Sequence, residues 1–227
     1  LIGARELYQA MKVSKKGFSL LELGGYAGII LYYLGMVFLE EKFHLAAILA
    51  GLVILMFIYV FRYPEYHAHQ VMAAFFGIVY VGVMLSCIYQ ARMLPGGHFH
   101  VWLMFLCSWG CDTCAYCAGM LFGKHKMAPV LSPKKSVEGA VGGVAGAVLL
   151  GVIFAAVTKG PAAEYAGICG AGALISMVGD LAASAVKRNM EIKDYGKLIP
   201  GHGGILDRFD SVIFTAPVIY YLALVLT

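Results

Sequence analysis

Charged residues are scarce in this chain: only 13% of its 227 residues are Asp, Glu, Lys or Arg, whereas 61% are hydrophobic. The hydrophobic residues also fall in blocks that are too long for the core helices of a soluble protein, because one helical crossing of a bilayer needs about 20 apolar residues. No signal-peptide pattern is visible. The composition therefore excludes a separate soluble domain and predicts an all-α, polytopic integral membrane bundle.

Seven apolar blocks predict seven transmembrane helices. They cover approximately residues 21–39, 45–61, 71–89, 101–122, 140–158, 165–186 and 211–226. Short polar joints separate them, so neighbouring helices are expected to be antiparallel. We expect a single membrane domain. Residues 1–100 would form an interfacial amphipathic helix over 2–13 and the first spans, and residues 101–227 would form the C-terminal catalytic region. Because the chain begins at Leu1 rather than Met, we also expect a shortened N-terminus with upstream spans missing.

Basic residues test this map. If the segment before the first block is cytoplasmic, 14 of the 17 Lys and Arg residues lie in cytoplasmic joints, and only Lys42, Arg92 and Lys159 lie on the other side. Such an excess is typical of cytoplasmic loops. It places the two most polar joints, 123–139 and 187–208, on the same face. Because these loops account for the net charge of +4, we expect no nucleic-acid partner.

Small residues in the apolar blocks indicate close helix packing. Gly142 and Gly146 are four residues apart, which permits helix contact at short range in lipid. Four of the six cysteines have spacings of four, three and three, which places them on one stripe of a helix: Cys107, Cys111, Cys114 and Cys117. The apolar surroundings favour a packing role for these thiols over zinc or iron–sulfur ligation.

Two acids interrupt the apolar blocks, Asp112 in the fourth and Asp180 in the sixth. A carboxylate at membrane depth costs about 2.5 to 3.5 kcal/mol on insertion scales unless it faces a polar cavity or a cation. Both aspartates are therefore candidate functional residues. For Asp112, a purely structural role remains open, because neighbouring Thr113 and Tyr116 could satisfy it.

The joint at 123–139 has the composition of an anion pocket. Pro129 and Pro133 stop a regular helix, while Ser132, Lys134 and Lys135 supply a hydroxyl and two positive charges. Lysines at this depth could equally serve as a cytoplasmic surface that attracts anionic lipid, at about 1 kcal/mol per basic residue. Composition alone leaves both interpretations open.

The joint at 187–208 carries the densest charge in the chain. Asp207 and Asp210 are three residues apart, so they share one face if they begin the seventh helix. Together with Asp180 they could bind Mg²⁺, which takes few carboxylates and keeps positions open for phosphate oxygens and water. The glycine-rich turn at 201–204 would offer backbone N–H groups to an anion just before the helix N-terminus. This pattern predicts phosphate chemistry.

Two segments resemble a known family. Residues 184–210 read SAVKRNMEIKDYGKLIPGHGGILDRFD, and they are similar over their whole length to the signature of the phosphatidate cytidylyltransferase family, also called CDP-diacylglycerol synthases. Residues 112–143 read DTCAYCAGMLFGKHKMAPVLSPKKSVEGAVGG and resemble the family's second recurring segment, with Cys114 where many members have Ala. The resemblance covers about the C-terminal half of the chain.

The resemblance implies transfer of a cytidylyl group from CTP to phosphatidic acid, giving CDP-diacylglycerol and pyrophosphate for phospholipid biosynthesis, with Mg²⁺ required. It further implies a homodimer in the inner, cytoplasmic membrane, surrounded by membrane lipids, with a polar cavity facing the cytoplasm. A second cation, monovalent or divalent, is left open.

The resemblance also assigns roles to residues. Asp180 and Asp207 would bind the metal, Asp210 would support them, and Asp112 would line the cavity. The implied catalytic set is Asp180, Asp207, Lys187, Arg188 and His202. The implied substrate-binding set is Asp112, Ser132, Lys134, Lys135, Lys193, Gly203, Gly204 and Arg208.

Three other classes of protein compete with this interpretation. A secondary transporter also places carboxylates beside glycine breaks, but it does not need two basic, glycine-rich joints on one face. A polyprenol or phytol kinase, or a cytidylyltransferase for ether lipids, would share the apparatus and use another acceptor. A structural lipid-binding protein would not need Asp180 and Asp207.

Overall fold

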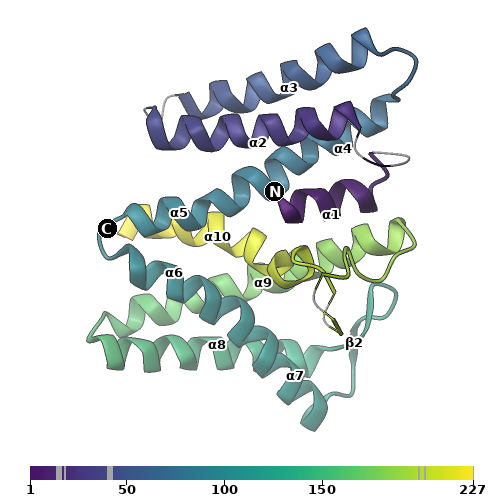
Figure 1. Ribbon diagram of the computed structural model, residues 1–227. Coiled ribbons are helices and arrows are strands. Elements are labelled where there is room, and N and C mark those ends of the chain that lie inside the picture. Colours follow the sequence, from purple (N-terminus) through teal and green to yellow (C-terminus); the bar gives the residue numbers. More distant parts are fainter. Residues whose placement is uncertain (14–16, 18, 40–42, 199, 202, 227) are drawn as a thin grey trace. The chain divides into compact units, whose positions relative to one another are not determined.

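The computed structural model describes residues 1–13, 17, 19–39, 43–198, 200–201 and 203–226 (Figure 1). Within these residues, seven helices are long and apolar enough to cross a membrane. They are Leu20–Phe38, His44–Phe61, Ala68–Met93, Gly97–Phe122, Val137–Thr158, Ala162–Asn189 and Leu206–Val225. Each coincides with one predicted block, so the prediction of seven spans is confirmed. The chain is a polytopic helical membrane protein.

The chain divides into two compact units. One unit contains Leu1–Ser86 and Asn189–Arg208, and the other contains Cys87–Arg188 and Phe209–Thr227. We call them the N-terminal unit and the C-terminal unit. The loop that follows the sixth span therefore belongs to the same unit as the first residues of the chain. The functional division expected at residue 100 stays a prediction.

The N-terminal unit begins with α1 (Ile2–Ala10), followed by α2 (Leu20–Phe38), α3 (His44–Phe61), α4 (Ala68–Gly77) and the π-helical segment η2 (Ile78–Val83). Helices α2 and α3 pack against each other along their length (Figure 1). Little of α3 is buried within this unit, as expected of a helix whose apolar side chains face lipid.

Helix α1 is held in the N-terminal unit by Tyr8. The Tyr8 ring is fully buried and lies where a side chain at Gly25 or Gly77 would stand. Its hydroxyl donates a hydrogen bond to the carbonyl oxygen of Ala74, at 2.9 Å. Burial and, second, the charge of Glu22 raise the pKa of Tyr8, so the phenol remains a donor. Helix α1 is thus shorter than the amphipathic helix predicted over 2–13, and it packs against the protein.

The C-terminal unit holds most of α5 (Met84–Met93), then α6 (Gly97–Phe105), the π-helical segment η3 (Leu106–Gly110), α7 (Cys111–Phe122), α8 (Val137–Thr158), nearly all of α9 (Ala162–Asn189), and α10 (Leu206–Leu226) from Phe209 onward. Its core includes the fully buried Leu103, Met104 and Cys107.

The predicted close contact between small residues is present between α7 and α8. Gly142 faces Ala118, and Gly146 faces Cys114, with so little room that an added Cβ would collide in both places. Cys111 is likewise buried against Gly143. Glycines at these positions therefore let the two helices approach closely, and the thiols pack at the contact.

The joint between α7 and α8 forms a small hairpin that was not predicted from the sequence. Strand β1 (Lys126–Ala128) pairs antiparallel with β2 (Ser132–Ser136). The Ser136 side chain then caps α8 by accepting a hydrogen bond from the N–H of Gly139, at 3.1 Å. Glu138 accepts hydrogen bonds from the backbone N–H groups of Lys124 and His125, which closes the base of the hairpin.

Candidate active site

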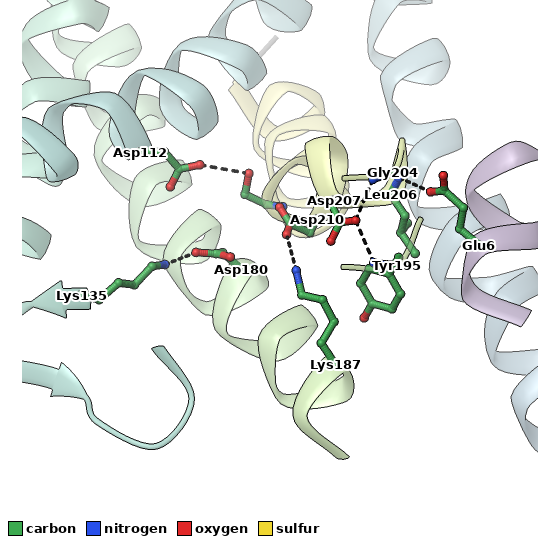
Figure 2. Close-up of polar contacts among 11 residues, drawn as sticks. Glu6, Asp112, Lys135, Asp180, Lys187, Tyr195, Gly204, Leu206, Asp207 and Asp210 are labelled. Carbon is green, nitrogen blue, oxygen red and sulfur yellow. Dashed lines mark hydrogen bonds and ion pairs between the residues drawn. The ribbon is translucent and has the colours of Figure 1, made fainter. Parts of the chain in front are cut away.

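Three aspartates gather in the C-terminal unit, each from a different helix. Asp112 lies on α7, Asp180 on α9 and Asp210 near the start of α10 (Figure 2). Asp180 is close enough to interact electrostatically with both of the others. Since three like charges in a membrane protein repel one another, the cluster requires cations or protons for its stability.

Two lysines supply positive charge to this cluster. Lys135 of β2 forms an ion pair with Asp180, and its side chain is 26% exposed. The Lys187 amine lies 3.7 Å from Asp210 Oδ2, and both side chains are only 11% exposed (Figure 2). Each lysine thus pairs with one carboxylate inside the protein, where little water screens the interaction.

Ser211 connects Asp112 to Asp210 and also bonds to Ser108. The Ser211 hydroxyl donates a hydrogen bond to Asp112 Oδ2, at 3.4 Å, and the Ser211 N–H donates to Asp210 Oδ1, at 2.8 Å. The hydroxyls of Ser211 and Ser108 share a further hydrogen bond of 2.6 Å. Ser108 lies in the π-helical segment η3, a type of segment that is frequent at functional sites.

A cavity of about 610 Å³ opens beside these groups. It is lined by residues of α7, the hairpin, α8 and α9, which include Asp112, Ser132, Lys134, Lys135 and Asp180. Five of the residues predicted from the sequence thus share one cavity, which contains both acidic and basic side chains. The volume is within the range of small-molecule sites, about 300 to 1,000 Å³.

The N-terminal unit holds the loop between α9 and α10 and the first residues of α10. Asp207 Oδ2 accepts hydrogen bonds from the backbone N–H groups of Tyr195, at 2.8 Å, and Gly204, at 2.9 Å. Gly203 has φ +82°, a conformation that favours glycine, and a Cβ there would stand 2.9 Å from Asp207 Oδ2. Asp207 therefore organises the turn that precedes its own helix.

The remaining predicted residues have varied surroundings. Asp207 lies in the first turn of α10 and Asp210 directly after that turn, which confirms that they lie at the start of the seventh span. Lys134, Arg188, Lys193 and Arg208 are exposed. The N–H of Gly204 is bonded to Asp207, and phosphate binding by Gly203 and Gly204 stays a prediction. His202 lies outside the described residues. The expected approach of Asp207 to Asp180, which belong to different units, also stays a prediction.

Sequence reasoning missed three polar residues. Ser108 and Ser211 are completely or nearly buried in apolar blocks, and hydroxyls there need partners, which was a signal that could have been used. Glu6, at 6% exposed, accepts hydrogen bonds from the N–H groups of Ile205 and Leu206. No local pattern points to a contact across about 200 residues.

The carboxylates suit a hard cation such as Mg²⁺, which prefers oxygen ligands. Among the described side chains, no three His, Cys, Asp or Glu residues come together as a metal-binding group. A cage built from protein ligands alone is therefore not formed there. Mg²⁺ commonly takes one or two carboxylates and completes its coordination with phosphate oxygens and water. The aspartate cluster fits a metal that arrives with a polyphosphate substrate.

Comparison with known proteins agrees with this site. A profile described as "Cytidylyltransferase family" matches residues 1–226. A phosphatidate cytidylyltransferase of Synechocystis sp. is 45% identical over 135 residues, which are 58% of this chain and 45% of that protein. Phosphatidate cytidylyltransferases of Staphylococcus saprophyticus (39% over 145 residues) and Bacillus subtilis (38% over 148 residues) each align with 63% of this chain and 55% of their own length. The chain thus spans about half the length of the curated relatives it matches. Its match over residues 1–226 establishes that it belongs to the cytidylyltransferase family.

Proposed function

We propose that this chain transfers the cytidylyl group of CTP to phosphatidic acid, producing CDP-diacylglycerol and pyrophosphate. The observation that carries the proposal is the cavity of the C-terminal unit, where Asp112 and Asp180 share a wall with Lys134 and Lys135. Both substrates are polyanions. Lysines bind phosphate oxygens, and carboxylates can hold the metal ion that accompanies a polyphosphate. The names of the relatives support the choice of phosphatidic acid as acceptor.

The reaction needs no protein nucleophile. An oxygen of the lipid phosphate forms a bond to the α-phosphorus of CTP, and the bond from that phosphorus to the bridging oxygen of the β-phosphate breaks. The lipid phosphate is already ionised at neutral pH, so no general base is needed to activate it. What the protein must supply is orientation and positive charge, because two anions approach each other and a pyrophosphate anion leaves.

The predicted site residues would have separate parts in this scheme. Lys135 and Lys134 would bind phosphate oxygens, and the Ser132 hydroxyl would donate a hydrogen bond to the same groups. Asp180 and Asp207 would hold Mg²⁺, with Asp210 in support. When bound, the metal supplies charge that stabilises the phosphates in the transition state. Lys187 would keep Asp210 oriented through their ion pair, at 3.7 Å.

The lipid acceptor explains the placement of the site within the spans. The cavity is lined by α7, α8 and α9, which are parts of membrane-crossing segments. A phosphatidic acid molecule could keep its acyl chains in the bilayer while its phosphate enters the cavity. We further propose that the protein resides in the inner membrane as a homodimer with the cavity facing the cytoplasm, where CTP is available. The bias of basic residues to one side supports this orientation.

Product formation by the purified protein tests the proposal. The protein in detergent should convert radiolabelled CTP to a lipid-soluble nucleotide only when phosphatidic acid and Mg²⁺ are both present. Phytol, a polyprenol and an ether-linked phosphatidic acid serve as alternative acceptors in parallel reactions. Efficient use of one of these in place of phosphatidic acid would overturn the proposed acceptor. Transport of a solute without any lipid product would overturn the enzyme class.

A further inference from the structure

Glu6 of α1 bonds to the helix that carries Asp207. Its Oε1 accepts a hydrogen bond from the N–H of Ile205, at 3.0 Å, and its Oε2 accepts one from the N–H of Leu206, at 2.7 Å (Figure 2). All these residues belong to the N-terminal unit. The first N–H groups of a helix have no partner within that helix, so a side chain from elsewhere usually satisfies them. Glu6 thus caps α10 from a distant part of the chain.

The loop before α10 is shaped to accept the Glu6 carboxylate. A Cβ at Gly204 would stand 2.5 Å from Glu6 Oε1, and a Cβ at Gly196 would collide with the same oxygen. The backbone of the loop therefore approaches Glu6 from two sides at positions where a larger residue would interfere. Glu6 is 6% exposed, so water does not compete effectively for its oxygens.

The same helix start has a second support from α1. Leu206 is 1% exposed, and its side chain lies 3.6 Å from the Cβ position of Gly3. The residue after Leu206 is Asp207, whose Oδ2 accepts the N–H groups of Tyr195 and Gly204. The Glu6 carboxylate, on α1, thus fixes the start of α10, and the Asp207 carboxylate, on α10 itself, holds the preceding loop. Displacing Glu6 would therefore move the backbone that orients Asp207.

We propose that Glu6 is a positioning residue for cytidylyl transfer: it fixes the N-terminus of α10 and the preceding loop so that Asp207 is held in a productive orientation. This inference rests on the proposed function. It makes α1 part of the catalytic apparatus, although Glu6 is not among the residues that line the cavity. Negative charge at a helix N-terminus is also favourable to the helix dipole, which suits a carboxylate in this role.

The test compares Glu6→Gln with Glu22→Gln. Gln keeps the size of the side chain but replaces one acceptor oxygen by a donor NH₂ group, which cannot accept the second N–H. Glu22 is a matched control, because it is also buried in the N-terminal unit, at 2% exposed, and bonds to Tyr26 within α2. The first measurement is hydrogen exchange in the protein without substrates. Glu6→Gln should speed exchange of the Ile205 and Leu206 amides by about tenfold, whereas Glu22→Gln should leave them unchanged.

The second measurement separates positioning from general destabilisation. In cytidylyl transfer, Glu6→Gln should lower kcat by about tenfold and raise the Mg²⁺ concentration for half-maximal rate, with little change in KM for phosphatidic acid. Glu22→Gln should change neither, even if it melts at a lower temperature. Unchanged exchange at Ile205 and Leu206, or equal kinetic effects in the two variants, would overturn the proposal. A faster Glu6→Gln enzyme would also overturn it.

A second variant applies if Glu6→Gln does not fold. Gly196→Ala keeps the carboxylate but places a methyl group against Glu6 Oε1, which forces the side chain away from the helix start. It should reproduce the faster exchange and the lower kcat, and normal values of both would refute the inference. If the parent protein has no cytidylyltransferase activity, the proposed function fails. The exchange comparison still shows whether Glu6 fixes the loop, so the two failures are distinguishable.

Discussion

Replacing Lys135 by Met should lower cytidylyl transfer strongly without unfolding the protein. Lys135 lines the cavity and forms an ion pair with Asp180, and the two side chains are only 26% and 24% exposed. A lysine amine and a phosphate charge about 4 Å apart interact by about 4 kcal/mol at an effective dielectric constant of about 20. Lys134 lines the same cavity and would offset part of this loss. We therefore expect a net loss of about 2 kcal/mol of transition-state stabilisation, or about 30-fold in kcat/KM for CTP.

The assay is steady-state formation of CDP-diacylglycerol from CTP at saturating phosphatidic acid and Mg²⁺. Lys124→Met is the matched control, since Lys124 is an exposed basic residue of the same joint and is not among the residues that line the cavity. It should retain normal kcat/KM. Lys135→Arg keeps the positive charge and should recover part of the rate. If Lys135→Met is as active as Lys124→Met, the electrostatic argument for the cavity is refuted.

Three further predictions concern single substitutions. Asp207→Asn should abolish turnover while the protein remains folded in detergent, because it removes a charged ligand without changing size; a near-normal rate would contradict the metal assignment. Gly203→Ala should reduce activity more than Gly201→Ala. Both glycines have positive φ, so a backbone strain of about 1 kcal/mol is common to both variants. Only at Gly203 would the new Cβ collide with the Asp207 side chain. Equal activities of these two variants would show that the turn does not orient Asp207. Gly142→Ala should lower the melting temperature by an amount that corresponds to about 1 to 3 kcal/mol of unfolding free energy, because α7 and α8 must separate. Gly167→Ala, with open space around the new methyl group, should be neutral or stabilising. The same melting temperature for both variants would contradict the packing argument.

The seven spans could be predicted because hydrophobicity in a membrane protein is a local property of the sequence. Each predicted block agrees with a spanning helix to within about five residues at either end. A physical argument also predicted that Asp112 and Asp180 each need a polar cavity or a cation, since a carboxylate at membrane depth is costly without one. Both line the cavity of the C-terminal unit, but the argument did not predict that they share it.

Other features could not be predicted because they depend on how distant surfaces meet. The contact of Glu6 with Ile205 and Leu206 joins residues about 200 positions apart, and no spacing rule connects them. The hairpin at 126–136 is too short and too charged to show a strand pattern, and its form depends on closure by Glu138. Ser211 bonds to both Asp112 and Asp210, and its partner Ser108 lies on a different span, so nothing in their local sequence shows that they meet.

The most direct test of the central claim compares the parent protein with Asp180→Asn in one assay. Purified protein, CTP, phosphatidic acid and Mg²⁺ are incubated together, and the CDP-diacylglycerol and pyrophosphate formed are quantified. The account predicts equal amounts of both products from the parent and none above background from Asp180→Asn, which should remain folded. If the parent protein forms no CDP-diacylglycerol, or if Asp180→Asn forms it at a normal rate, the account is contradicted.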